Sequence, residues 1–350
     1  MSGSPARTDA DATADVVCLG ESMVTFLPSR PGRLADVPSF GRGIGGAESN
    51  VACALAAAGH RAAWVSRVGA DGFGDHLVDA ISAYGVDTSA VRRDPARPTG
   101  IYFRTATDRA TEVHEVAYYR AGSAASAMSP ANVPYEALFA GRVLHLSGIT
   151  AALSADCLAL LHELTAPRPG RPLVSFDVNH RPGLWRDGGT SPDVLLDLAR
   201  RADLVFVGED EAEEAWGVKG VAAIREALPE PAVLVVKRGA EGATVFTGGP
   251  GPSGTVTSVP ALRVDVVAPV GAGDAFAAGF LSATLRGLPV RDRARHGHLM
   301  AAAVLTVPGD LTDPPARDRA DRLVALDDAD WGRLRLGPGW TGDDQEVRTR

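Results

Sequence analysis

The sequence predicts an α/β fold, a three-layer sandwich in which helices cover both faces of a mostly parallel sheet, with a small β lid. Three observations predict it. Short, fully apolar runs recur along the chain, segments with helical periodicity lie between them, and one aromatic-rich region alternates residue by residue. Fully apolar runs are typical of strands buried on both faces, and their alternation with helices is typical of parallel sheets.

Six apolar runs predict the strands of the central sheet, at residues 16–20, 62–69, 143–149, 173–179, 204–208 and 233–239. Five segments between or after them predict helices: ESNVACALAAAG, GDHLVDAISAYG, DCLALLHELTA, SPDVLLDLARRA and VAAIREAL. Strands joined through helices run parallel, so their carboxyl ends meet at one edge of the sheet. Ligands of open α/β sheets bind at that edge.

Two aromatic-rich segments predict the lid. TGIYFRTAT and HEVAYYRAG flank the polar turn DRAT, a pattern typical of an antiparallel hairpin. MVTFLPS near the start adds a third strand, which places the lid near residues 22–45 and 98–121. We expect one domain over residues 15–335, a disordered tail over 1–14 and a flexible tail over 336–350.

Composition excludes several classes of function. A net charge of −8 argues against a nucleic-acid partner, which usually meets a basic face. No apolar run approaches the roughly 20 residues that span a bilayer, and the first 15 residues contain no apolar segment. Three widely spaced cysteines, at positions 18, 53 and 157, predict buried thiols in a reducing compartment. We therefore expect a cytoplasmic protein with no membrane partner.

The stretch PVGAGDAFAAGF, residues 269–280, carries the strongest chemical signal. Gly271, Ala272 and Gly273 precede Asp274 directly, and an apolar helical pattern follows. A helix that begins at Ala272 or Gly273 points unpaired amides at a phosphate, and its dipole favours negative charge there. A carboxylate beside such a site suits a general base. The alternative is a helix cap on a tight glycine turn.

GAGDAFAAGF resembles the C-terminal signature of the ribokinase-like sugar kinases, the PfkB family. GGAESNVACALAAAG, residues 45–59, is similar to that family's other signature, and the resemblance runs from about Val16 to about Leu326. It implies a ribokinase-like sandwich, ATP and Mg²⁺ as cofactors, and transfer of a phosphoryl group to a sugar. In that family's pattern Asp274 is the base, and Gly271, Ala272 and Gly273 form the anion hole.

Three further segments resemble the 2-keto-3-deoxygluconate kinases within that family: FDVNHRPGLW, YYRAGSAASAMSP and LHLSGITAALS. Arg120 and Arg181 would suit an acid sugar, because arginine pairs bidentately with a carboxylate. The alternatives are a solvated lid charge for Arg120 and an ion pair with Asp177 for Arg181. The resemblance implies the following sugar-site residues: Gly46, Ala47, Asn50, Tyr102, Tyr118, Arg120, Arg181 and Asp310. The two tyrosines could instead pack the lid.

The nucleotide side departs from the family pattern at several positions. VKRGAEGATVF resembles the segment that leads into the ATP site, which implies that Lys237, Gly239 and Gly242 bind ATP, together with Gly271 and Gly273. The family's Asn-x-x-Glu motif is here GEDE, with Gly208 in place of asparagine. Its Glu211 is the expected outer-sphere partner of Mg²⁺, or else an exposed helix carboxylate.

Two more departures concern ions and adenine. Ala268 stands where relatives often carry an aspartate, which puts activation by a monovalent cation in doubt. Met300 stands where many relatives have an asparagine near adenine.

The hypothesis from the sequence is a kinase that phosphorylates the terminal hydroxyl of 2-keto-3-deoxygluconate, to give 2-keto-3-deoxy-6-phosphogluconate. The alternatives are a fructokinase, a ribokinase, a 2-ketogluconate kinase or a sugar-binding sensor that transfers nothing. We also expect a homodimer through the lid, because open strand edges seek partners.

Overall fold

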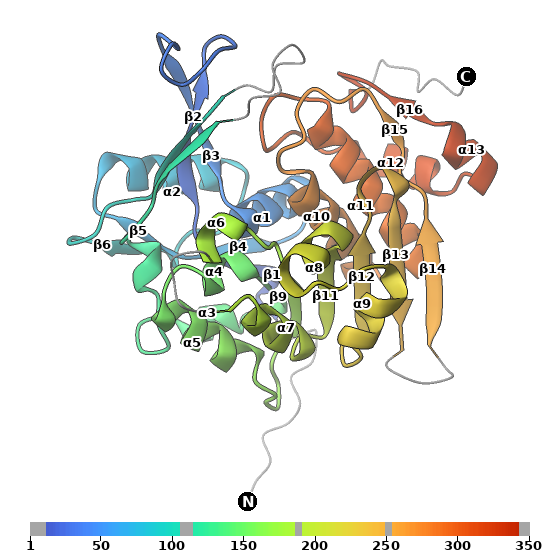
Figure 1. Cartoon of the computed structure of the whole chain (residues 1–350), viewed down its shortest axis with the longest axis horizontal. Coiled ribbons are helices and arrows are strands. Elements are labelled where there is room, and N and C mark those ends of the chain that lie inside the picture. The colour runs from blue at the N-terminus through green and yellow to red at the C-terminus, as the bar shows by residue number, and fades with distance from the viewer. Residues whose placement is uncertain (1–11, 106–114, 186–190, 249–253, 343–350) are drawn as a thin grey trace, which may run out of the picture.

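The computed structural model describes residues 12–105, 115–185, 191–248 and 254–342. Its largest sheet has the order β14-β13-β12-β11-β10-β9-β1-β4 (Figure 1). Six of these strands run parallel: β1 Ala14–Leu19, β4 Ala62–Val65, β9 Gly141–Ser147, β10 Leu173–Asp177, β11 Leu204–Gly208 and β12 Val233–Lys237. These are the six strands that the apolar runs predict.

Two strands at one end of the sheet, β13 (Ala243–Thr247) and the edge strand β14 (Thr255–Val259), were not predicted and run antiparallel. β14 is largely exposed and rich in threonine, so it lacks the apolar run of a doubly covered strand. The predicted strand over residues 62–69 divides at Ser66. Its second half, β5 (Arg67–Gly69), leaves the central sheet and pairs with β6 (Arg92–Asp94).

Helices cover both faces of the central sheet, which confirms the three-layer architecture. Alternate residues of β1 show why: Val16 and Cys18 join one hydrophobic cluster, Val17 and Leu19 the other. The first cluster packs under α1 Ala47–Ala57, α2 Gly72–Ala83, α10 Ala272–Leu285, α11 Val290–Leu305, α12 Arg317–Val324 and α13 Asp328–Arg333. The second packs under α3 Tyr135–Leu138, α4 Gly148–Ala151, α5 Ala155–Thr165, α6 Pro182–Trp185, α7 Asp193–Arg200, α8 Glu209–Trp216 and α9 Val221–Ala227. The three cysteines are buried and free, as predicted.

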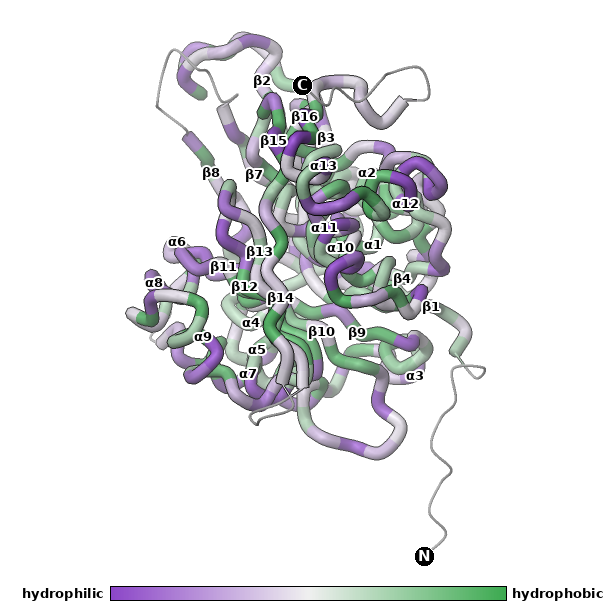
Figure 2. Tube along the Cα trace, turned by 90° about the vertical axis from the view of Figure 1, so that its right-hand side faces the viewer, coloured by the Kyte–Doolittle hydropathy of each residue, from purple (hydrophilic) through white to green (hydrophobic). Residues whose placement is uncertain are grey.

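The lid is a four-stranded sheet of order β3-β2-β7-β8. Its strands are β2 Met23–Pro28, β3 Phe40–Gly45, β7 Ile101–Arg104 and β8 Val116–Tyr119. β7 and β8 pair antiparallel, which confirms the predicted hairpin, although its turn DRAT lies outside the described residues. Figure 2 shows these strands standing away from the central sheet.

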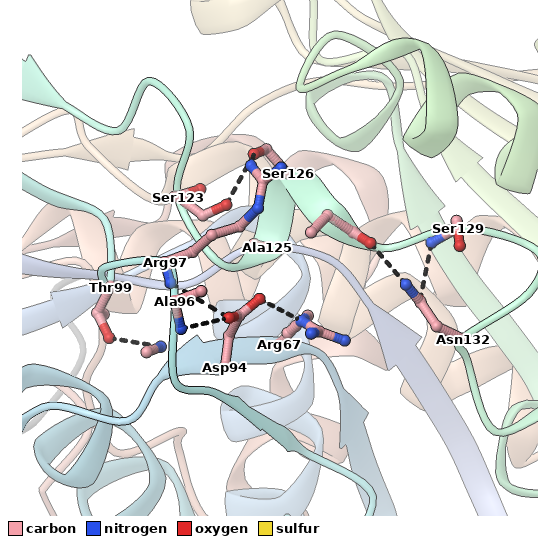
Figure 3. A network of polar contacts seen from close by, with 12 residues as sticks. Arg67, Asp94, Ala96, Arg97, Thr99, Ser123, Ala125, Ser126, Ser129 and Asn132 are labelled. Atoms are coloured by element: carbon pink, nitrogen blue, oxygen red, sulfur yellow. Dashed lines mark hydrogen bonds and ion pairs between the residues drawn. The ribbon is translucent and has the colours of Figure 1, made fainter.

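The chain that leads into the lid is tied down around Asp94 (Figure 3). The Asp94 carboxylate accepts hydrogen bonds from Arg67 Nε at 2.8 Å and from the backbone amide of Ala96 at 2.9 Å. Five residues later, just before β7 begins, the Thr99 hydroxyl accepts a hydrogen bond from the backbone amide of Gly69. The base of the lid is therefore fixed to the body of the domain.

The expected tail boundary at residue 336 is wrong. β16 (Arg335–Leu336) pairs with β15 (Arg263–Val264), and Leu336 and Trp340 are buried in the first cluster. At the other end, β1 already begins at Ala14. The remainder of both expected tails, residues 1–11 and 343–350, lies outside the described residues. No helix in the described part of the chain has the length and apolarity needed to cross a membrane.

Candidate active site

Helix α10 begins at Ala272, as the glycine loop predicts, and its N-cap is Gly271. Gly271 has φ +78°, a left-handed conformation that glycine adopts without strain. A Cβ atom at this position would also stand 2.6 Å from the backbone oxygen of Asp310. Both constraints require glycine. The first amides of α10 have no side-chain cap.

Asp274 lies in the first turn of α10 and faces Asn50 of α1. Asn50 Nδ2 donates a hydrogen bond of 2.9 Å to Asp274 Oδ2. Burial raises the pKa of Asp274 to about 7, against the opposing effect of this hydrogen bond; nearby Asp177 also raises it, whereas Arg181 and Lys237 lower it. Because the N-cap is Gly271, the alternative that Asp274 caps the helix is wrong. A carboxylate with a pKa near neutrality suits a base.

Lys237, at the end of β12, stands beside the mouth of α10. Its Nζ donates to both carboxylate oxygens of Asp177 at 3.0 Å and would lie 3.6 Å from a Cβ atom at Gly273. Burial disfavours the charge of Lys237, but Asp177 and Glu211 outweigh that effect and raise its pKa. Sequence reasoning did not select Asp177 as functional. Its place at the carboxyl end of a predicted central strand was the available signal.

A cavity of about 850 Å³ opens beside Lys237 and the start of α10. Its size is within the range of small-molecule sites. Of the expected nucleotide residues, Lys237, Gly239, Gly242 and Gly273 line it and Gly271 does not. The other lining residues include Ala272, Leu262, Phe276, His298, Ala301 and Ala302. Gly242 has φ +120°, and a Cβ atom there would collide with the carbonyl oxygen of Val259.

The expectation that Met300 stands near adenine stays a prediction. Met300 does not line this cavity; it packs on Gly279 and lines a different cavity, of about 830 Å³.

Five of the eight predicted sugar-site residues lie close together near Asp274. Gly46 is the N-cap of α1 and Ala47 its first residue, and a Cβ atom at Gly46 would collide with the backbone of Glu21. The Tyr102 hydroxyl donates a 3.3 Å hydrogen bond to Asp310 Oδ2. Asn50 and Asp310 line one small cavity. The structure thus brings Gly46, Ala47, Asn50, Tyr102 and Asp310 together, and their role in binding a sugar stays a prediction.

Arg104 is a residue that sequence reasoning missed. Its Nη2 donates to Asp310 Oδ1 at 2.7 Å, and both side chains are buried. Burial raises the pKa of Asp310, although Arg104 and the Tyr102 hydroxyl oppose the shift. The signal was present, because alternation along IYFR places Tyr102 and Arg104 on one face of β7.

Arg120 is not the solvated lid charge of the alternative interpretation. Its guanidinium forms an ion pair with the buried Glu21 at the carboxyl end of β1, and the Ser123 hydroxyl donates to the other Glu21 oxygen at 2.5 Å. Tyr118 is 54% exposed, so it does not pack the lid interior, whereas Tyr102 does. The two tyrosine rings lie 5.4 Å apart, centre to centre.

Arg181 pairs with Glu211 at 3.5 Å, so the alternative of a pair with Asp177 is wrong. The Arg181 side chain remains 51% exposed. Glu211 is not an exposed helix carboxylate. Its Oε2 accepts a hydrogen bond of 2.8 Å from the backbone amide of Gly208 and so caps the start of α8. No group of three or more His, Cys, Asp or Glu residues in the described ranges is arranged to hold a metal ion.

Comparison with known proteins decides the family. Residues 13–317 match the family described as pfkB family carbohydrate kinase. The chain belongs to this family. It is 38% identical over 313 residues to a 2-dehydro-3-deoxygluconokinase of Bacillus subtilis, covering 87% of this chain and 94% of that protein. It is 33% identical to a 2-dehydro-3-deoxygluconokinase of Thermoproteus tenax, with 92% and 97% covered.

A solved structure extends the comparison. It is that of an uncharacterized sugar kinase from Pyrococcus horikoshii in complex with ATP. The TM-score is 0.75 at 25% identity, over 87% of this chain and 96% of that chain. The predictions of the ribokinase-like fold and of the family are thus confirmed.

In this pfkB family kinase, Ala268 is buried and its backbone amide bonds to the oxygen of Leu305. Its methyl side chain offers no oxygen ligand to a cation. The doubt about monovalent-cation activation therefore stays a prediction.

Proposed function

We propose that this protein is an ATP-dependent kinase that phosphorylates the terminal hydroxyl of 2-keto-3-deoxygluconate, giving 2-keto-3-deoxy-6-phosphogluconate. The observation that carries the proposal is the Asp274 carboxylate, with a pKa of about 7, at the uncapped start of α10 beside Lys237. The choice of acceptor is supported by the two relatives, which are both 2-dehydro-3-deoxygluconokinases. The name 2-dehydro-3-deoxygluconate denotes the same compound as 2-keto-3-deoxygluconate. We place the protein in the cytoplasm.

The residues around the 850 Å³ cavity fit a nucleotide. Glycines at positions 239 and 273 leave room for a ligand to approach the backbone, and Lys237 would supply a partly buried cation for phosphate oxygens. Mg²⁺ bound with ATP would neutralise negative charge on the phosphates. Glu211 would reach that ion through water, because its carboxylate also closes the start of α8.

Asp274 would take the proton of the attacking hydroxyl as the acceptor oxygen approaches the phosphoryl group. The amides of Ala272, Gly273 and Asp274 would stabilise charge on the transferred group, with the dipole of the 14-residue helix α10 behind them. Asn50 holds the base in place through its 2.9 Å hydrogen bond. Phosphoryl transfer needs little more than this alignment and charge neutralisation.

The acceptor carboxylate would bind chiefly to Arg181. Arg181 is half exposed and its contact with Glu211 is long, so its donors are available. Arg120 would contribute its remaining donors while Glu21 holds the guanidinium. Gly46, Ala47, Tyr102, Tyr118 and Asp310 would line the rest of the sugar site.

A substrate panel tests the proposal. The purified protein is given MgATP and one acceptor at a time, and ADP is measured with a coupled assay. We expect the highest kcat/KM with 2-keto-3-deoxygluconate. A higher value with fructose, ribose or 2-ketogluconate would replace the acceptor. ADP production with none of them would favour a sugar-binding sensor.

Arg181→Ala then tests the carboxylate contact. Losing a charged hydrogen bond costs about 1.5–3 kcal/mol, so KM for the keto acid should rise about 10- to 100-fold. KM for a neutral sugar should change less than about threefold. Equal changes for both acceptor classes would remove Arg181 from the carboxylate site.

We also propose that the protein forms a homodimer through the lid. β8 is an outer strand of the lid sheet, and it carries two exposed tyrosines, Tyr118 and Tyr119. Aromatic side chains on an open strand edge suit a protein interface. Light scattering should give twice the chain mass, and Tyr119→Asp should reduce it to one chain. A wild-type protein of single-chain mass would contradict this proposal.

A further inference from the structure

One buried ion pair joins the lid to the loop that follows α11. Arg104 is the last residue of lid strand β7, and its Nη2 lies 2.7 Å from Oδ1 of Asp310. The side chains are only 5% and 7% exposed. The same nitrogen lies 3.4 Å from the backbone oxygen of Pro308. The lid therefore contacts this loop through a buried pair of opposite charges.

The loop continues the connection to the catalytic helix. The backbone oxygen, Cα and carbonyl carbon of Asp310 are the three atoms nearest to the place where Gly271 would carry a side chain, at 2.6 to 3.2 Å. Gly271 is the N-cap of α10 and sets the direction of its first amides. Asp310 thus contacts two segments that are distant from it in sequence: the end of β7 and the start of α10.

The chemistry makes this connection sensitive to the position of the lid. A buried arginine and a buried aspartate each lose hydration, and each depends on the other for compensation. The Nε of Arg104 is buried and has no hydrogen-bond partner within the described residues, so its guanidinium depends on Asp310 and Pro308. A lid that moves away must either expose both charges to water or leave Asp310 buried and alone.

We propose that Arg104 is a positioning residue that couples the seating of the lid over the sugar to the anion-binding start of α10. This inference rests on the proposed kinase function. With the lid seated, Arg104 holds the Asp310 carboxylate, and the backbone of Asp310 supports Gly271 and the amides that follow it. With the lid displaced, that support is lost. The protein therefore aligns its anion hole fully only when the lid covers an acceptor, which limits transfer to water.

Arg104→Gln tests the coupling, because glutamine keeps a donor but loses the charge. We expect kcat for transfer to the acceptor to fall about 10- to 100-fold, with KM for ATP changed less than about threefold. The ratio of acceptor-independent ATP hydrolysis to transfer should rise about tenfold. Arg171→Gln is the matched control. It breaks another Arg–Asp pair, with Asp203 at 3.0 Å, beside the start of β10 in the central sheet and outside the lid sheet.

A double-mutant cycle of Arg104→Gln and Asp310→Asn separates coupling from simple destabilisation. If the pair acts as one unit, the double variant loses no more kcat than either single variant. Additive losses, or the same kinetic change in Arg171→Gln, would overturn the proposal. So would a wild-type kcat and hydrolysis ratio in Arg104→Gln.

Hydrogen exchange supplies a readout that does not need activity. In the wild type, an inert ATP analogue with a keto sugar acid should protect amides of β7 and of the first turn of α10 together. In Arg104→Gln the acceptor should no longer add protection to α10. An unchanged pattern in this variant would overturn the coupling. A wild type that phosphorylates no acceptor would instead contradict the proposed function, and the exchange result would still decide whether the coupling exists.

Discussion

At the scale of single residues, the site depends on how Asp274 is ionised. Burial raises its pKa, the Asn50 amide opposes that shift, and the balance is a pKa of about 7. An ordinary aspartate, with a pKa of 3.8, would be a weak base for a hydroxyl. The carboxylate therefore combines proton affinity with a substantial ionised fraction at neutral pH.

Asp274→Asn should leave the protein folded and reduce kcat by about 10³-fold, because the amide cannot take a proton. The measurement is the coupled ADP assay together with thermal unfolding. Asp318→Asn is the control, since Asp318 is an exposed carboxylate paired with surface Arg322 and with local backbone. A variant of Asp274 with near-normal turnover would remove it as the base.

The raised pKa also predicts a pH dependence. Activity should rise with pH through about 7, as Asp274 loses its proton. Its effect on stability has the opposite direction. Between the ordinary pKa of 3.8 and the raised value, the native state holds a proton that the unfolded chain has released, so this group makes folding less favourable as pH rises.

Asp274→Asn should therefore gain stability over the wild type as pH increases from about 4 to 8. Urea unfolding at several pH values measures this difference. A stability difference between variant and wild type that stays constant with pH would show that the pKa of Asp274 is not raised.

At the scale of elements, the sequence predicted what depends on local pattern. Apolar runs identified the six parallel strands, aromatic alternation identified the β7–β8 hairpin, and the glycine loop gave the start of α10 at Ala272. β14 was missed because an exposed, threonine-rich edge strand shows no such run, and β13 because threonines interrupt its short apolar stretch. Partners of charged groups were beyond reach, because they meet across the fold: Lys237 and Asp177 are 60 residues apart, Arg104 and Asp310 206.

The start of α10 gives a prediction at this scale. Gly271→Ala adds a Cβ atom 2.6 Å from the Asp310 oxygen at a φ of +78°, so it should cost about 1–3 kcal/mol of stability and most of the activity. Urea unfolding and the ADP assay measure both. Gly72→Ala in α2 is the control, because nothing lies within 4 Å of its added Cβ and its φ is not positive. Equal effects of the two substitutions would contradict the constraint.

At the scale of the whole molecule, an acidic chain of net charge −8 must bind two anions, ATP and a sugar acid. The cations that we propose for these anions are few, and each pairs with a carboxylate of the chain: Lys237 with Asp177, Arg181 with Glu211 and Arg120 with Glu21. The third pair joins the lid to the central sheet, since Arg120 follows β8 and Glu21 follows β1. Sequence reasoning offered substrate binding or a solvated lid charge for Arg120 and did not foresee this structural partner.

Removing Arg120 should therefore destabilise the whole domain, whereas removing Arg181 should not. Arg120→Met leaves the buried Glu21 without its cation, which costs about 3–5 kcal/mol, while the exposed Arg181 contributes about 0–1 kcal/mol. Urea unfolding of both variants measures the contrast. Adding Glu21→Gln to Arg120→Met should restore much of the loss, because the uncompensated charge is then gone. If the double variant is no more stable than Arg120→Met, the ion pair does not hold the lid to the sheet, and Arg120 returns to a role in substrate binding alone.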